Sequence, residues 1–73
     1  MWVLLGVSDD TIEKETFVYF IGIFNDLNVA KEERKRLITT TNSNQDCFFI
    51  KSVIMNASYN YDWCNTDENE VKV

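Results

Sequence analysis

Four carboxylate residues that could bind a metal ion lie between the first two apolar segments of the sequence. They are Asp9, Asp10, Glu13 and Glu15. Carboxylate oxygens are the ligands that Mg²⁺ and Ca²⁺ prefer in proteins. However, the spacing of these residues differs from that of a calcium-binding loop, and no glycine lies among them. We therefore interpret the cluster as a solvated acidic loop, and we predict neither a metal site nor a cofactor.

Residues that commonly carry out acid–base or nucleophilic catalysis are scarce in this sequence. It contains no histidine, and histidine is the commonest general base and the commonest metal ligand. Cys47 and Cys64 therefore have no imidazole to activate them, and the sequence has no glycine-rich phosphate loop or serine-centred elbow. We predict a protein without enzymatic activity.

The two cysteines allow either one disulfide or two free thiols. Residues 1–7 lack the basic residues that begin a secretory signal. We therefore expect a cytoplasmic protein, located in the host cytosol if the chain is viral, and disulfides are rare in that compartment. We predict that both thiols are reduced, with Cys47 buried at the start of a strand and Cys64 accessible.

Acidic residues outnumber basic ones by twelve to seven, which gives a net charge of −5. This balance argues against direct binding to the phosphate backbone of a nucleic acid. Four basic residues do gather in one short segment: Lys31, Arg34, Lys35 and Arg36. Because Glu32 and Glu33 interrupt this group, we interpret it as the solvated, mixed-charge face of a helix.

An aromatic stripe near the C-terminus is the strongest candidate for a binding site. Tyr59, Tyr61 and Trp63 alternate with polar residues. Four acidic residues lie beside the stripe: Asp62, Asp67, Glu68 and Glu70. Aromatic anchors within an acidic surface suit a protein partner that has a basic surface. The alternative is that these rings only close over the sheet.

Three segments have the composition of strands, namely residues 2–7, 16–24 and 47–55. Residues 26–41 have the 3.6-residue period of an amphipathic helix. We expect Asn25 to be its N-cap, and we expect the helix to end by residues 42–44. Its apolar face is expected to contain Leu27, Ala30, Leu37, Ile38 and the stem of Arg34.

This order of elements predicts an α+β fold of the ββαβ type. We expect a small three- to four-stranded mixed sheet with the helix on one face, in which the first strand pairs antiparallel with the second and lies between the other two. Residues 59–63 alternate like a strand, which would be either a fourth strand at the edge or a continuation of the third strand past a bulge at residues 56–58. Residues 1–64 are expected to form a single domain, and residues 65–73 a mobile, polar and acidic tail. The longest apolar run, residues 17–24, is too short to span a membrane.

Both faces of the second and third strands are apolar, which indicates that both faces of the sheet are covered. A single helix covers only one face. We therefore expect a homodimer or another protein partner to cover the second face.

The segments 18–25 and 48–54, with Ala30 facing inward from the helix between them, resemble a group of small uncharacterised phage and bacterial proteins with a ββαβ order. The resemblance implies the fold and a phage or viral source, but no chemistry. We favour a non-enzymatic interaction protein that binds or inhibits a host protein stoichiometrically. Inhibitors of host nucleic-acid machinery, such as anti-CRISPR and other anti-defence proteins, are the analogy. The alternatives are a protein that sequesters a small ligand or nucleotide, and a structural virion or assembly subunit.

Overall fold

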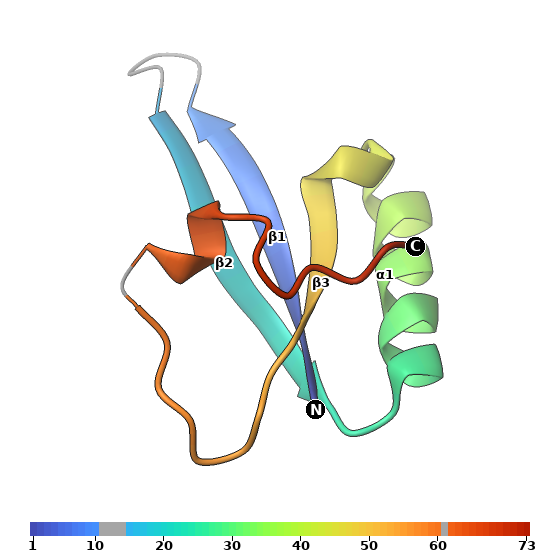
Figure 1. Ribbon diagram of the computed structural model, residues 1–73. Coiled ribbons are helices and arrows are strands. Elements are labelled where there is room, and N and C mark those ends of the chain that lie inside the picture. Colours follow the sequence, from blue (N-terminus) through green and yellow to red (C-terminus); the bar gives the residue numbers. More distant parts are fainter. Residues whose placement is uncertain (11–14, 61) are drawn as a thin grey trace.

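The computed structural model describes residues 1–10, 15–60 and 62–73 (Figure 1). Its elements, in chain order, are β1 (Trp2–Asp10), β2 (Glu15–Phe24), α1 (Leu27–Thr41), a 3₁₀ turn η1 (Gln45–Cys47), β3 (Phe48–Ser52) and a second 3₁₀ turn η2 (Trp63–Asn65). In the described part of the chain, no helix is long and apolar enough to cross a membrane.

The three strands form one sheet in the order β2-β1-β3, with β1 antiparallel to both neighbours. This arrangement confirms the predicted α+β fold, its ββαβ order and the central position of β1. Both pairings are antiparallel, so the sheet has no parallel pair of the kind that a mixed sheet would contain. The reason is that β2 and β3, which run in the same direction, are separated by β1.

Two glycines within the strands have identifiable roles. The register of β1 with β2 shifts between Leu4 and Leu5, which leaves Ile21 as an extra residue beside Gly22. Such a bulge is a common place for a strand glycine. At Gly6, a Cβ atom would overlap the ring of Tyr19 on the neighbouring strand. Gly6 therefore allows that ring to lie directly over the backbone of β1.

The third strand is shorter than predicted, because it ends at Ser52 rather than at Met55. Its partner β1 begins at Trp2, which lies opposite Ser52. One further pair of hydrogen bonds joins Met1 and Val53, at 2.8 and 3.1 Å. The described ladder between β1 and β3 ends at this pair.

Two other predicted strand assignments differ from the structure. Cys47, which was expected to open the third strand, lies in η1. In the candidate fourth strand, Tyr59 and Asn60 are irregular and Trp63 begins η2, while Tyr61 lies outside the described residues. The described part of that segment is therefore not a strand.

Helix α1 has its N-cap at Asp26, one residue after the predicted Asn25. The Asp26 carboxylate accepts hydrogen bonds from the backbone N–H groups of Asn28 at 2.8 Å and Val29 at 3.4 Å. At the other end, Asn42 adopts a left-handed conformation with φ of 53° and closes the helix, as asparagine tolerates better than most residues. The predicted end of the helix is confirmed.

The core lies between the sheet and α1, which packs on one face of the sheet (Figure 1). Leu4, Ala30, Phe48 and Ile50 form its buried centre. Leu27, Leu37 and Ile38 pack against it, as the helical period predicted. The Arg34 side chain reaches past this face, because its Nε donates to the Phe48 carbonyl at 2.9 Å and its Nη2 donates to the Gln45 carbonyl at 2.7 Å.

Part of the acidic segment 65–73 lies along the outer edge of β3. Ser52 N–H donates to the Asn69 carbonyl at 2.9 Å, and Val71 N–H donates to the Ile50 carbonyl at 2.8 Å. Val71 also packs against the core. Residues 69–71 therefore cover the edge of β3 that faces away from β1.

Candidate functional site: an apolar groove

Lys51 identifies the face of the sheet that α1 does not cover. Its neighbour Ile50 lies in the core beneath the helix, and alternation along β3 sends Lys51 to the opposite face. Lys51 is fully buried there, at 0% exposure. Its Nζ donates to the Trp63 carbonyl at 2.6 Å and lies 3.4 Å from the Thr66 hydroxyl. Because a buried ammonium requires acceptors, these contacts hold η2 against the sheet.

Two aromatic residues strengthen this attachment. The Lys51 Nζ lies 4.2 Å from the centre of the Trp63 ring, which is within the range of a cation–π contact. The Tyr59 ring packs on Trp63 with their centres 4.4 Å apart. The Tyr59 hydroxyl accepts a hydrogen bond from Ile54 N–H at 2.7 Å. Residues 53–60 and 62–66, the covering segment, are thus folded back over the second face of the sheet, so the chain itself supplies part of the cover expected there.

An apolar groove of about 610 Å³ lies between the second face of the sheet and this covering segment. Its volume falls within the range of ligand pockets in proteins, which is roughly 300–1,000 Å³. Among the described residues that line the groove, none has a charged side chain. The strands contribute Val3, Leu5, Val18, Phe20 and Ile23, and the covering segment contributes Ile54, Met55, Tyr59, Trp63 and Cys64. The groove thus offers an apolar surface rather than acid–base groups.

Several of the residues that line the groove remain accessible to solvent. Ile54 is 76% exposed, Met55 is 67% exposed and Phe20 is 63% exposed. Ile23 is also exposed. Contiguous exposed apolar patches on soluble monomers are usually small and often functional. This groove is therefore the strongest candidate for a functional site.

The structure brings only part of the predicted aromatic and acidic site together. Tyr59 and Trp63 are in contact, but Trp63, which belongs to the covering segment, is only 8% exposed. Tyr61 lies outside the described residues. The acidic residues of the predicted site are exposed and do not line the groove. These residues are Asp62, Asp67, Glu68 and Glu70. Glu70 instead lies opposite Lys51 at the outer edge of β3, in a bridge whose hydrogen bonds are made by the neighbouring residues.

Sequence reasoning missed Lys51 and the exposed residues Ile54 and Met55 as parts of this site. One available signal was that Lys51 is the single charged residue in the apolar segment 47–55. The other was the presence of apolar residues on both faces of the strands. Neither pattern tells which later segment of the chain folds over the second face.

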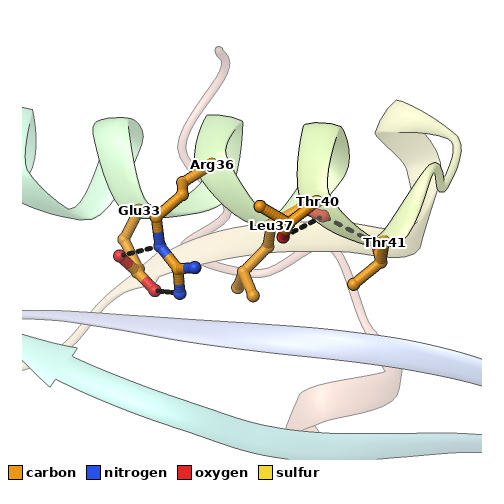
Figure 2. Close-up of polar contacts among 5 residues, drawn as sticks. All are labelled: Glu33, Arg36, Leu37, Thr40 and Thr41. Atoms are coloured by element: carbon orange, nitrogen blue, oxygen red, sulfur yellow. Dashed lines mark hydrogen bonds and ion pairs between the residues drawn. The ribbon is translucent and has the colours of Figure 1, made fainter.

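The basic residues of α1 lie outside the groove, and one of them, Arg36, makes a contact within the helix. Arg36 forms an ion pair with Glu33 through two hydrogen bonds (Figure 2). The hydrogen bond from Arg36 holds the pKa of Glu33 below its usual value, and the same contact raises the pKa of Arg36. In the last turn, the hydroxyls of Thr40 and Thr41 donate to the Leu37 carbonyl (Figure 2). These contacts stabilise the helix locally.

The acidic cluster between β1 and β2 falls mostly outside what the structure describes. Glu13 and the side chains of Asp9, Asp10 and Glu15 lie outside the described residues. Among the residues that are described, no three acidic or cysteine side chains are grouped so that they could hold a metal ion. Cys47 and Cys64 are free thiols, and each is partly buried.

No known protein family, no curated protein and no solved structure matches this chain. Of the resemblance to small phage and bacterial proteins, the structure therefore supports the ββαβ topology alone.

Proposed function

We propose that this chain is a non-enzymatic binding protein whose apolar groove receives apolar side chains of a protein partner. The observation that carries the proposal is the combination of a groove without charged side chains among its described lining residues and the exposed residues Phe20, Ile54 and Met55 along it. Protein interfaces derive most of their binding energy from a few apolar anchors that become desolvated in such pockets.

The exposed acidic residues near the C-terminus have a separate role in this proposal. Asp62, Asp67 and Glu68 are exposed and lie outside the groove. Exposed charges mainly accelerate the encounter with an oppositely charged partner and contribute less to the lifetime of the complex. We therefore propose a partner that has apolar anchors within a basic surface.

A small apolar molecule is the second candidate for the occupant, because the volume of the groove suits one. A nucleotide is disfavoured, since no charged side chain among the described lining residues could pair with its phosphates. Native mass spectrometry of the freshly isolated chain separates the two candidates. A co-purifying molecule of a few hundred daltons would favour the small ligand.

The test of the protein-binding proposal compares residues inside and outside the groove. Ile54→Glu and Met55→Glu place a charge at positions that are already exposed, so the fold is expected to tolerate both changes. Val29→Glu is the matched control, because Val29 is an exposed apolar residue on α1 that does not line the groove. Trp63→Ala is unsuitable, because Trp63 is buried and its loss would disturb the covering segment itself.

The measurement begins with a photo-crosslinking amino acid at Met55, which identifies proteins that touch the groove in cells. The partner is then purified and titrated against each variant. We expect Ile54→Glu and Met55→Glu to weaken binding at least tenfold, and Val29→Glu to change it less than twofold. Equal affinities for all three variants would show that the partner binds elsewhere.

A further inference from the structure

Strand β2 forms the outer edge of the sheet on the side opposite β3. Within the described part of the chain, the backbone of residues 17–24 makes hydrogen bonds with no segment other than β1. Figure 1 shows β2 at one side of the sheet and α1 toward the other. The edge of β3 is covered by residues 69–71, whereas no described segment is hydrogen-bonded along the outer edge of residues 17–24.

The hydrogen bonds at the β3 edge fix the direction of the backbone groups across the sheet. The backbone N–H and C=O groups of Ile50 and Ser52 point toward residues 69–71, away from β1. Because this direction alternates along an antiparallel strand, the groups of Phe49 and Lys51 point toward β1. Their partners on β1 are Leu5 and Val3. The backbone N–H and C=O groups of these two residues therefore point toward β3.

The same alternation extends across β1 to β2. Since Leu5 and Val3 point toward β3, their partners on the other side, Phe20 and Ile23, direct their N–H and C=O groups to the outer edge. Val18, which lies opposite Val7, does the same. These three residues also line the apolar groove. The open backbone edge and one wall of the groove are thus made by the same residues.

Residues 17–24 lack most of the features that keep an edge strand from pairing. They include neither a charged residue nor a proline, although both are common protections of exposed edges. The bulge at Ile21 is the one such feature present. In a chain of net charge −5, an uncharged apolar strand of this length is well suited to contact another strand.

We infer that a second copy of the chain pairs its β2 antiparallel with this edge, around a twofold axis near Phe20. The two three-stranded sheets then become one six-stranded sheet. Each copy places its Phe20 and Ile23 beside the open side of the other copy's groove. The twofold contact is isologous, so a single surface covers both open edges at once. An unrelated strand would cover only one of them.

The exposed area of β2 is compatible with a small dimer interface near the lower limit for biological interfaces. Its four exposed apolar side chains are Phe17, Tyr19, Phe20 and Ile23. If each buries on the order of 100 Å², the side chains alone contribute roughly 800 Å² over the two copies. Pairing the backbone edges adds to this value, so the total approaches the roughly 1,000 Å² that a biological interface requires. Within residues 17–24 the two copies bring no like charges into contact, because this segment is uncharged.

The experiment measures the mass of the purified chain over a concentration series by light scattering and analytical ultracentrifugation. We expect a species of twice the 8.6 kDa monomer mass. Phe20→Lys places a charge on the edge at a position that is already 63% exposed, and it should raise the dissociation constant at least tenfold. Val29→Lys is the matched control on α1 and should leave it within twofold.

A second variant tests the backbone edge without changing any side chain. Chemical synthesis, with ligation at Cys47, allows a methyl group on the backbone nitrogen of Phe20. Because that nitrogen points outward, the methyl group should spare the pairing of β2 with β1 but block the second copy. We expect the N-methylated chain to keep the circular dichroism of the wild type and to be monomeric.

Two results would overturn the inference. One is a wild-type chain that stays at 8.6 kDa up to millimolar concentration. The other is a dimer that survives both the N-methyl group and Phe20→Lys, because such a dimer would use another surface. Neither result bears on the proposed protein partner, which is tested at Ile54 and Met55 on the opposite wall of the groove.

Discussion

The buried ammonium of Lys51 contacts both the ring and the backbone of Trp63. Its Nζ lies 4.2 Å from the centre of the ring and 2.6 Å from the Trp63 carbonyl oxygen. A single side chain of β3 therefore fixes the position of η2, which lies twelve residues later in the sequence. The second face of the sheet, and with it the apolar groove, depends on this attachment.

We predict that Lys51→Met loosens the covering segment and leaves the core beneath α1 folded. The change removes a charged hydrogen bond and a cation–π contact, and it also removes the cost of burying a charge. The expected net loss is about 1–3 kcal/mol in the free energy of unfolding. Urea denaturation measures this loss. In a Trp2→Phe background, the emission of Trp63 should also shift to longer wavelength as the ring becomes solvated.

The control for this change is Lys35→Met, which removes a lysine from an exposed position on α1. It should change the free energy of unfolding by less than about 0.5 kcal/mol. The emission of Trp63 should stay the same. If Lys51→Met behaves like this control, the contact between Lys51 and Trp63 does not hold the segment in place.

The N-cap of α1 gives a prediction with a neighbouring control. Asp26→Ala removes the carboxylate that accepts from Asn28 N–H and Val29 N–H, and it should destabilise the fold by about 1 kcal/mol. Asn25→Ala should have little effect, because Asn25 precedes the cap. Thermal unfolding followed by circular dichroism distinguishes the two variants. A larger loss of stability for Asn25→Ala than for Asp26→Ala would show that Asn25 is the N-cap.

Local patterns predicted the parts of this fold that depend on neighbours in sequence. The 3.6-residue period placed Ala30, Leu37 and Ile38 on the buried face of α1, and the structure confirms this placement. The choice between Asn25 and Asp26 as the N-cap was beyond these patterns, because both residue types are good caps.

Contacts between distant segments account for the differences between the predictions and the structure. The end of β3 at Ser52 depends on where its partner β1 begins. The groove depends on the attachment of η2 to Lys51 across the sheet. Alternation of residue types reports which face a side chain occupies, but it does not identify the segment that covers that face.

The Glu33–Arg36 pair predicts a small dependence of stability on acid pH. Arg36 lowers the pKa of Glu33 below the ordinary value of 4.5. The unfolded state therefore binds a proton at a higher pH than the folded state does. The contribution of the pair is present above the unfolded pKa and is lost as the pH falls through the folded pKa. Both side chains are on the surface, so the effect should be small.

This prediction is checked by NMR titration of the Glu33 side chain. In the Arg36→Gln variant, the pKa of Glu33 should rise toward its ordinary value. Lys31→Gln serves as the comparison, because it removes a positive charge elsewhere on the same helix. An unchanged Glu33 pKa in Arg36→Gln would mean that the ion pair does not persist in solution.

The free thiols predict how the chain reacts with alkylating agents. Cys47 and Cys64 are unpaired, so mass spectrometry under non-reducing conditions should show two alkyl groups added to freshly isolated protein. An unlabelled chain lighter by two hydrogens would instead indicate a disulfide between them. Because Cys64 lines the groove, a bulky label on Cys64 in a Cys47→Ser variant should also block the protein partner.

The inferred β2 dimer should become tighter as the salt concentration rises. Each copy carries a net charge of −5, so two copies repel each other at long range. The paired segments, residues 17–24, are uncharged, so salt weakens no attraction between them. Salt shortens the reach of the repulsion to about 10 Å at 0.1 M. The dissociation constant measured by sedimentation should therefore decrease as the NaCl concentration is raised from about 0.02 M to about 0.5 M. The double variant Asp67→Asn, Glu68→Gln removes two exposed charges and should reduce this dependence. A dimer that instead weakens with salt would rest on ion pairs between the copies, and β2 would not be its contact.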